Sequence, residues 1–359
     1  MKKIVLMFAA VALAIPAMGQ GVVFEEISIG QALAKAGAEN KQVFVDCYTS
    51  WCGPCKKMTN DVFPRKDVGD YFGPRFISVK YDMEKDEDGI MLGKEHRVTG
   101  YPTYLILNPD GSLLHKFMGA YDAPLFLRKV DESFDDGRAY GSLKKAYDEG
   151  NRNRDFLEKA LEGFTSVRDP QTQEVVAQLV GQLSDKEKTS PDYWFIYATD
   201  LLDTIGSANE KYLFENASRF RKNIGAEKVD PVLERHYYER LMNIIRLKEE
   251  IGVKDMDRMA KQIKKLRLGG DVNALTNTAV AVICGDFDTL IAVAADELPG
   301  MENPMEPYFM LSDRIKDDGT LEQKRAWIEL GEILTPLVAP DKRGWMEAVT
   351  KHLREQAGL

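Results

Sequence analysis

The stretch that decides the fold is VFVDCYTSWCGPC, residues 43–55. Its first half is a short apolar, partly β-branched run, which predicts a buried β-strand over residues 42–48. Its second half places Cys52 and Cys55 at the start of a helix that follows directly. Cysteines three residues apart on a helix share one face, at a separation that a disulfide bond tolerates. The stretch therefore predicts a cysteine pair at a strand-to-helix junction.

The two cysteines are expected to differ in reactivity. The positive end of the helix dipole and the free backbone N–H groups should lower the pKa of Cys52. Cys55, one turn into the helix, is expected to be more buried and to stay protonated longer. Cys52 would then attack a substrate disulfide, and Cys55 would resolve the mixed disulfide.

Two other interpretations of the pair stay open at this point. One is an inert structural disulfide. The other is half of a zinc site, which would need two further Cys or His residues at ligand spacing. The remaining cysteines, Cys47 and Cys284, stand alone, and the four His residues are scattered. No metal site is therefore predicted.

The pattern around this stretch alternates between helix and strand. The order is α-β-α-β-α-β-β-α, which predicts a mixed central sheet with helices on both faces. Helices are expected over residues 31–41, 52–71, 89–96 and 123–134, and strands over residues 42–48, 76–82, 103–108 and 112–118.

After residue 141 the strand signal disappears. Apolar residues recur at helical spacing, which predicts an all-α region of roughly ten helices, either a compact bundle or a stack of helical hairpins. The segments with this spacing include residues 156–164, 174–183, 193–205, 233–247, 266–286 and 321–334. Pro191, Pro231, Pro304 and Pro340 are expected near helix starts or ends. The predicted domains are residues 20–137 and 138–359.

Length and charge exclude several classes of protein. The chain has 359 residues, 44% of them hydrophobic, which is typical of a globular protein of about two domains. It has 48 Lys and Arg residues against 57 Asp and Glu residues, a formal charge of −9. Binding to nucleic acid needs a basic surface, so nucleic acid is not an expected partner.

The N-terminal segment has the pattern of a secretory signal. Lys2 and Lys3 precede an apolar run over residues 4–15, and Ala17 and Gly19 are the small residues before a cut at Gln20. The run is shorter than the ~20 residues that span a bilayer. Residues 1–19 are therefore predicted to be a signal peptide, and the mature chain is expected to be soluble and periplasmic or otherwise exported. An uncleaved N-terminal anchor helix is the alternative.

Two motifs together resemble a known family. Residues 43–55, followed about fifty residues later by Gly100-Tyr101-Pro102-Thr103, are similar to thioredoxin. Tyr48-Thr49-Ser50-Trp51-Cys52 and the spacing of Val62, Phe63 and Val68 more closely resemble the C-terminal thioredoxin-like domain of bacterial thiol:disulfide interchange proteins. The resemblance covers residues 24–136. It implies an α/β thioredoxin-like fold and dithiol–disulfide exchange without a bound cofactor. The helical region resembles no family that we recognise.

The resemblance also assigns acid–base roles. Asp46 matches the buried carboxylate that helps to remove the proton from Cys55, and a desolvated carboxyl has the raised pKa that this role requires. Lys80 matches a lysine near this aspartate. The alternatives are a hydrogen-bonded Asp at a strand end and a solvated strand Lys.

Four further residues are expected to contact substrate. Pro102 matches the family's cis-proline beside the cysteines, which leaves the preceding backbone free to pair with an extended substrate. Tyr101 would line the cleft, and Trp51 would be a surface aromatic that shields the sulfur. Gly119 matches a glycine that admits a partner chain. The alternatives are a trans Pro, a core Trp and a bulge Gly.

The sequence departs from the family at two positions. Tyr48 stands where thioredoxin usually has Trp, and Cys47 stands where it usually has an aromatic residue. Strand alternation directs Cys47 away from Asp46, which favours a packed, inert thiol over a third redox centre. Cys284, in an apolar helical stretch, is expected to lie in the core.

The function predicted from these observations is an exported thiol–disulfide oxidoreductase, a protein-disulfide reductase or isomerase. Its partners would be proteins with disulfides and a membrane electron donor of the thiol:disulfide interchange type. The alternative is a non-catalytic binding or chaperone-like module with a thioredoxin fold. The direction of electron flow and the task of the helical region are left open.

Overall fold

The computed structural model describes residues 21–359, so the predicted signal peptide lies outside the described residues. The chain forms two compact units, which divide after Gln182. Within residues 21–359, no helix combines the length and the apolar character needed to cross a bilayer.

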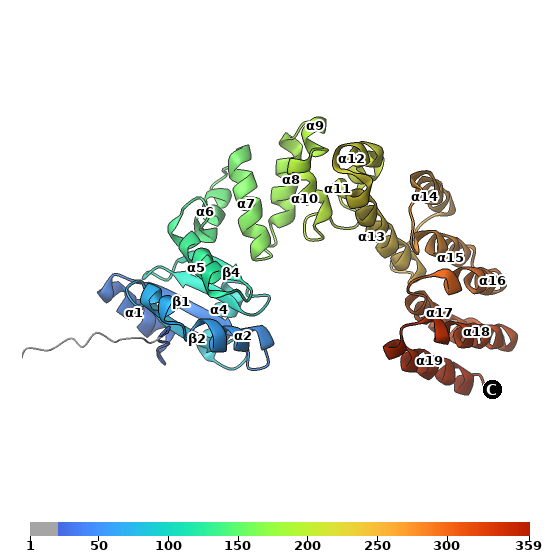
Figure 1. Cartoon of the computed structure of the whole chain (residues 1–359), viewed down its shortest axis with the longest axis horizontal. Helices are drawn as coiled ribbons and strands as arrows, with labels where there is room; N and C mark the ends of the chain where they lie inside the picture. The colour runs from blue at the N-terminus through green and yellow to red at the C-terminus, as the bar shows by residue number, and fades with distance from the viewer. Residues whose placement is uncertain (1–20) are drawn as a thin grey trace, which may run out of the picture. The chain divides into compact units, whose positions relative to one another are not determined.

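The first unit contains a four-stranded sheet with the order β2-β1-β3-β4. Figure 1 shows this sheet among helices in the part of the chain coloured from blue to green. The strands are β1 Gln42–Tyr48, β2 Phe76–Asp82, β3 Thr103–Leu107 and β4 Leu113–Met118. β1 pairs in parallel with β2 and antiparallel with β3, so the sheet is mixed as predicted. β1 is buried on both faces, which explains its continuous apolar run.

Helices cover both faces of this sheet. Val45 and Cys47 point to a core cluster with α1 (Ile29–Glu39) and α4 (Glu87–Glu95). Phe44 points to the opposite cluster, where Phe72 of α3 (Lys66–Phe72) and Phe126 of α5 (Ala123–Asp131) pack with aromatic residues of the strands. The mixed sheet with helices on both faces is as predicted.

The predicted helix over residues 52–71 is wrong as a single element. It is divided into α2 (Gly53–Lys57), a π-helical turn (Met58–Val62) and α3 (Lys66–Phe72). Pro64 cannot donate a hydrogen bond to the preceding turn, and Arg65 is extended at φ −68°, ψ 136°. The break frees the carbonyl of Phe63, which accepts the N–H of Val22 at 2.7 Å.

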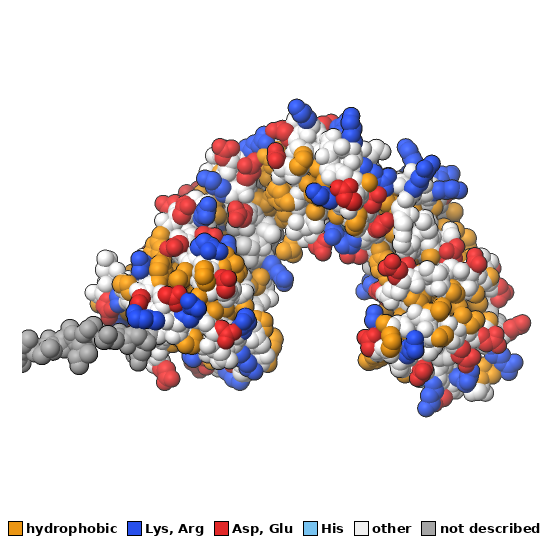
Figure 2. Space-filling model, viewed as in Figure 1, with side chains coloured by type: hydrophobic (Ala, Val, Ile, Leu, Met, Phe, Trp, Pro, Cys, Tyr) orange, Lys and Arg blue, Asp and Glu red, His pale blue; other side chains and the backbone are white. Residues whose placement is uncertain are grey.

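The second unit, residues 183–359, is helical, and most of its helices pack on neighbours in sequence, as in stacked helical hairpins. The pairs in contact include α11 with α12, α15 with α16 and α18 with α19. Its helices are α9 Asp185–Lys188, α10 Trp194–Ala198, α11 Ala208–Glu215, α12 Ala217–Ile224, α13 Ala226–Ile245, α14 Val253–Leu266, α15 Val272–Cys284, α16 Phe287–Glu297, α17 Met305–Asp318, α18 Leu321–Leu334 and α19 Arg343–Gln356. Figure 2 shows acidic and basic side chains interspersed over the visible face.

Two details of this region differ from the sequence prediction. The segment 193–205 is α-helical only to Ala198, after which Thr199 is extended. Pro231 lies inside α13 rather than at its end. Pro231 removes one backbone donor, but Val229 and Leu233 on either side are fully buried, and this packing keeps the helix continuous.

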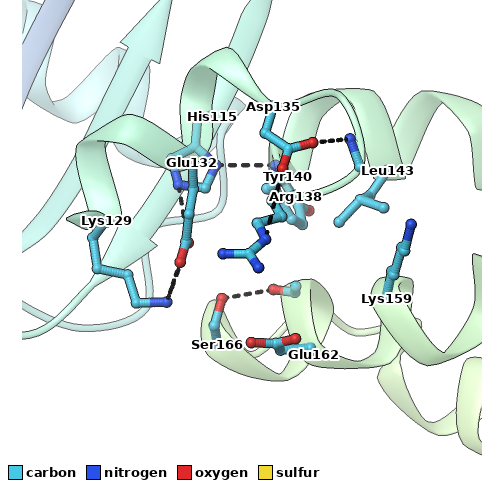
Figure 3. A pocket seen from close by; sticks show the side chains of 12 residues that line it. His115, Lys129, Glu132, Asp135, Arg138, Tyr140, Leu143, Lys159, Glu162 and Ser166 are labelled. Atoms are coloured by element: carbon cyan, nitrogen blue, oxygen red, sulfur yellow. Dashed lines mark hydrogen bonds and ion pairs between the residues drawn. The ribbon is translucent and has the colours of Figure 1, made fainter.

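The first unit extends past the predicted boundary at residue 138 because helix α6 (Tyr140–Asp148) packs on the edge strand β4. The N–H of Tyr140 donates to Nδ1 of the buried His115 at 3.0 Å (Figure 3). A cleft of about 400 Å³ lies at this joint. The unit ends with α7 (Arg154–Ser166) and α8 (Thr172–Gln182). The end of the thioredoxin-like domain at residue 137 stays a prediction.

Gly141 allows α6 to lie close to β4, and its substitution tests this packing. A Cβ on Gly141 would lie 2.0 Å from the carbonyl oxygen of Leu113. We expect Gly141→Ala to destabilise the first unit by about 1–3 kcal/mol, because the helix must move off the strand. Gly181→Ala in α8 is the matched control, since nothing lies within 4 Å of its added Cβ. Urea unfolding measures the stability of both variants, and equal stability of the two would contradict the close packing of α6 on β4.

Candidate active site

The two cysteines lie where β1 leads into α2, and they are joined by a disulfide bond with a Cα–Cα distance of 5.3 Å. Cys52 is the N-cap residue of α2, and the N–H of Cys55 donates to its Sγ at 3.1 Å. Pro54 falls in the first turn, where its missing N–H breaks no helical bond. This geometry supplies a hydrogen-bond donor to the Cys52 sulfur, which favours its thiolate once the disulfide is reduced.

The expectation that Cys55 is more buried than Cys52 is wrong. The two residues are 4% and 3% exposed. The N–H of Cys52 donates to the carbonyl of Thr49 at 3.2 Å, which ties Cys52 to the residues that follow β1. A difference in reactivity between the two sulfurs would therefore come from their positions at the helix end and not from burial.

Asp46 lies on β1 beneath the cysteines and is 3% exposed. Burial raises the pKa of Asp46 to about 7, and the neighbouring Lys80 opposes part of this rise. Asp46 and Lys80 are register partners on β1 and β2. Both line a cleft of about 380 Å³ together with Cys55. The fold thus brings the two predicted acid–base residues to the second cysteine.

Cys47 lies on the other face of the sheet, among the residues that pack under α1 and α4. It is fully buried, and burial raises the pKa of its thiol well above the usual value. Cys47 does not line the cleft that contains Asp46 and Cys55. Its predicted role as a packed thiol stays a prediction.

Cys284 is exposed, so its predicted place in the core is wrong. It is the last residue of α15 and lines a surface groove with Asn277 and Val280. The helical period places these residues on one stripe, and the buried residues Leu275, Ala279 and Val282 form the other.

An exposed aromatic residue precedes Cys52 in the chain and contacts the loop of the cis-proline. Trp51 is 65% exposed, and its indole N–H donates to Glu84 Oε2 at 2.9 Å. The Trp51 and Tyr101 rings meet edge to face with centroids 6.0 Å apart. The Tyr101–Pro102 peptide is cis. The predicted substrate-side residues Trp51, Tyr101 and Pro102 therefore lie close together.

Gly119 has a backbone conformation that favours glycine, with φ 124°. Its N–H donates to the carbonyl of Pro102 at 2.9 Å. A Cβ at this position would lie 3.1 Å from the hydroxyl of Tyr121, so the chain itself occupies the nearby space. Contact of Gly119 with a substrate stays a prediction.

Sequence reasoning missed Glu84, which holds the Trp51 indole from 33 residues away. Nothing in the spacing of the two residues indicates this contact, because it depends on where β2 ends. Within residues 21–359, the structure brings together no group of three or more His, Cys, Asp or Glu residues that could hold a metal ion.

The first unit contains the residues that match a known protein family. Residues 29–133 match a family described as a thioredoxin-like domain. Mitochondrial thioredoxin-3 of Saccharomyces cerevisiae is 38% identical over 82 residues, which are 23% of this chain and 58% of that protein. Thioredoxin of Echinococcus granulosus is 32% identical over 94 residues, 26% of this chain and 80% of that protein. The chain thus spans little more than half of the yeast protein.

A solved structure is also similar to this part of the chain. The solution structure of a proposed disulphide-isomerase from Bacteroides thetaiotaomicron is 44% identical. The match covers 33% of this chain and 98% of the other, with a TM-score of 0.31.

The raised pKa of Asp46 predicts how stability depends on pH. Its pKa is about 3.8 in the unfolded chain and about 7 in the folded one, so the neutral carboxyl favours folding below pH 4. This contribution is lost as the pH rises through 7. We expect the free energy of unfolding of oxidised Asp46→Asn protein to rise by about 4 kcal/mol, relative to that of wild type, between pH 4 and pH 8. Urea unfolding at both pH values tests this, and a pH-independent difference would contradict the burial of an ionisable group.

Proposed function

Because the chain belongs to the thioredoxin family, we propose that it is an exported thiol–disulfide oxidoreductase that reduces or isomerises disulfide bonds of periplasmic proteins. The observation that carries the proposal is the Cys52–Cys55 disulfide at the start of α2, directly beside a buried carboxylate. An inert structural disulfide has no need of an ionisable group in that cleft.

The first step forms a mixed disulfide. The Cys52 thiolate attacks one sulfur of a client disulfide, a new Cys52–client S–S bond forms, and the other client sulfur leaves as a thiolate that takes up a proton. The N–H of Cys55 and the N-terminus of α2 lie at the Cys52 sulfur and favour its ionised form.

The second step releases the client. The Cys55 thiol gives its proton to Asp46 through the shared cleft, and the resulting thiolate attacks the Cys52 sulfur. The Cys52–Cys55 disulfide forms, and the second client sulfur leaves as a thiolate. Two electrons have then passed from the enzyme to the client. A pKa of about 7 allows Asp46 to accept a proton near neutral pH and to give it up again.

The cycle requires a reductant that restores the Cys52–Cys55 dithiol. We infer a membrane-bound dithiol donor of the thiol:disulfide interchange type, because a periplasmic enzyme cannot draw directly on cytoplasmic reductants. The same atoms also permit isomerisation. The client thiolate freed in the first step attacks another disulfide of the client, and the sulfur released there attacks the mixed disulfide, so that a new client disulfide forms, Cys52 leaves as a thiolate and no net oxidation occurs.

The client is proposed to bind over the aromatic opening of the site. Trp51 and Tyr101 supply apolar surface beside the disulfide, and the backbone before Pro102 can pair with an extended segment. Lys80 would help Asp46 to ionise again, since a nearby positive charge favours the carboxylate.

Removal of the nucleophile tests the reaction. We expect Cys52→Ser to lower the rate of insulin reduction at least a hundredfold, because no other thiol occupies the helix N-terminus. Cys55→Ala should accumulate mixed disulfides with client proteins. Cys284→Ser, which removes an exposed thiol outside the site, is the matched control and should retain full activity. Equal insulin reduction by wild type and Cys52→Ser would exclude this function and favour the binding-module alternative.

Export is tested separately. Expression of the full chain in a Gram-negative host should yield a periplasmic protein whose N-terminus is Gln20, because the small residues before it suit signal peptidase. Intact mass of the periplasmic fraction measures the cut. A Gly19→Leu variant should remain uncut. Recovery of uncut wild-type chain in the cytoplasm would refute export.

A further inference from the structure

Lys116 is a buried lysine in the edge strand β4, only 4% exposed. Its ammonium group donates two hydrogen bonds, at 2.9 Å to the carbonyl of His96 and at 3.0 Å to the carbonyl of Arg97. These carbonyls lie at the end of helix α4, where the helix dipole is negative. A buried ammonium is costly unless such acceptors compensate it, so this arrangement couples strand and turn firmly.

The other side of Lys116 faces the joint with the helical extension. Its ammonium lies 6.0 Å from the centre of the Tyr140 ring on α6. The Tyr140 hydroxyl donates to the carboxylate of Asp169, which precedes α8 and is itself buried. Burial lowers the pKa of Lys116, and the Asp169 carboxylate acts against this by favouring the charged form. Contacts between buried polar groups thus run from Asp169 through Tyr140 to Lys116.

The turn that Lys116 holds leads directly into the substrate-side loop. Arg97 adopts a left-handed conformation with φ 49°, and the N–H of Val98 closes the helix end on the carbonyl of Gly93 at 2.9 Å. Val98 and Tyr101 then pack on the core cluster under α1 and α4. The residues between the Lys116 acceptors and Pro102 are few, so a shift of the turn moves Tyr101.

We propose that Lys116 is a positioning residue for disulfide exchange, which fixes the loop of Tyr101 and Pro102 through the carbonyls of His96 and Arg97. Through Tyr140 and Asp169, the helical extension α6–α8 helps to hold Lys116, and therefore helps to fix the loop that contacts the substrate. This inference rests on the proposed function. It assigns a task to helices that lie beyond the residues matched by the thioredoxin-like family.

The decisive variant is Lys116→Met, which keeps most of the apolar stem and removes the ammonium. We expect the KM for insulin to rise about tenfold, because the protein substrate needs the positioned loop. The rate with a small aromatic disulfide should stay within about twofold of wild type, because a small disulfide needs only the Cys52 sulfur. A merely structural role would lower both rates together. Lys94→Met, which changes an exposed lysine in the last turn of α4, is the matched control.

Hydrogen–deuterium exchange reports on the loop without reference to activity. Lys116→Met should speed exchange over residues 96–101 and leave β1 unchanged, whereas Lys94→Met should change neither. Unchanged exchange and an unchanged KM in Lys116→Met would overturn the inference. If wild type itself fails to reduce insulin, the proposed function is wrong, and the exchange measurement still decides whether Lys116 positions the loop.

A milder variant covers the case in which Lys116→Met does not fold. Tyr140→Phe keeps the ring and removes only the hydroxyl that binds Asp169. We expect faster exchange over residues 96–101 and a KM for insulin raised about threefold, with the small-disulfide rate unchanged. Exchange in this loop equal to wild type would show that the helical extension does not reach it, and would refute the coupling.

Discussion

A sulfur atom held at the N-terminus of a helix is the constraint on which the rest of this site depends. The N–H of Cys55 points at the Cys52 sulfur, and this requires a strand that ends within a few residues of the helix start. The buried β1 strand meets the requirement, because partners on both sides and helices on both faces hold it in place. The aromatic core around Phe44 therefore serves the chemistry by holding the strand that carries Asp46.

The alternation of side chains along the sheet separates two polar systems. Asp46 points to one face, where its cleft joins it to Cys55 and Lys80. Cys47 and Lys116 belong to the other face, where the ammonium holds the end of α4. In the proposed mechanism, one face would handle the proton of the reaction, and the other would hold the loop of Tyr101 and Pro102. The period of two residues in a strand keeps the two systems apart.

The helical extension is built into the first unit. Gly141 lets α6 lie against the carbonyls of β4, and His115 accepts the N–H of Tyr140 at the same joint. An edge strand with unpaired groups is a site of unwanted association, and packing of a helix beside it protects it. The extension that protects the edge also provides the ring and carboxylate that face Lys116.

Local pattern was enough to predict the strands around the site, because burial and alternation within a few residues decide them. It did not predict the division of the helix expected over residues 52–71. The strand over residues 42–48 and the cysteines at a helix start could be derived in this way, whereas the place of the Asp46 carboxylate came from the resemblance to thioredoxin. Contacts between residues distant in sequence could not. Nothing in the spacing indicates that Glu84 holds Trp51, that Lys116 reaches the end of α4, or that Cys284 faces solvent. The sequence by itself determined the fold class and the reactive pair; only the tertiary structure decided which distant groups surround them, because those contacts depend on how elements pack in three dimensions.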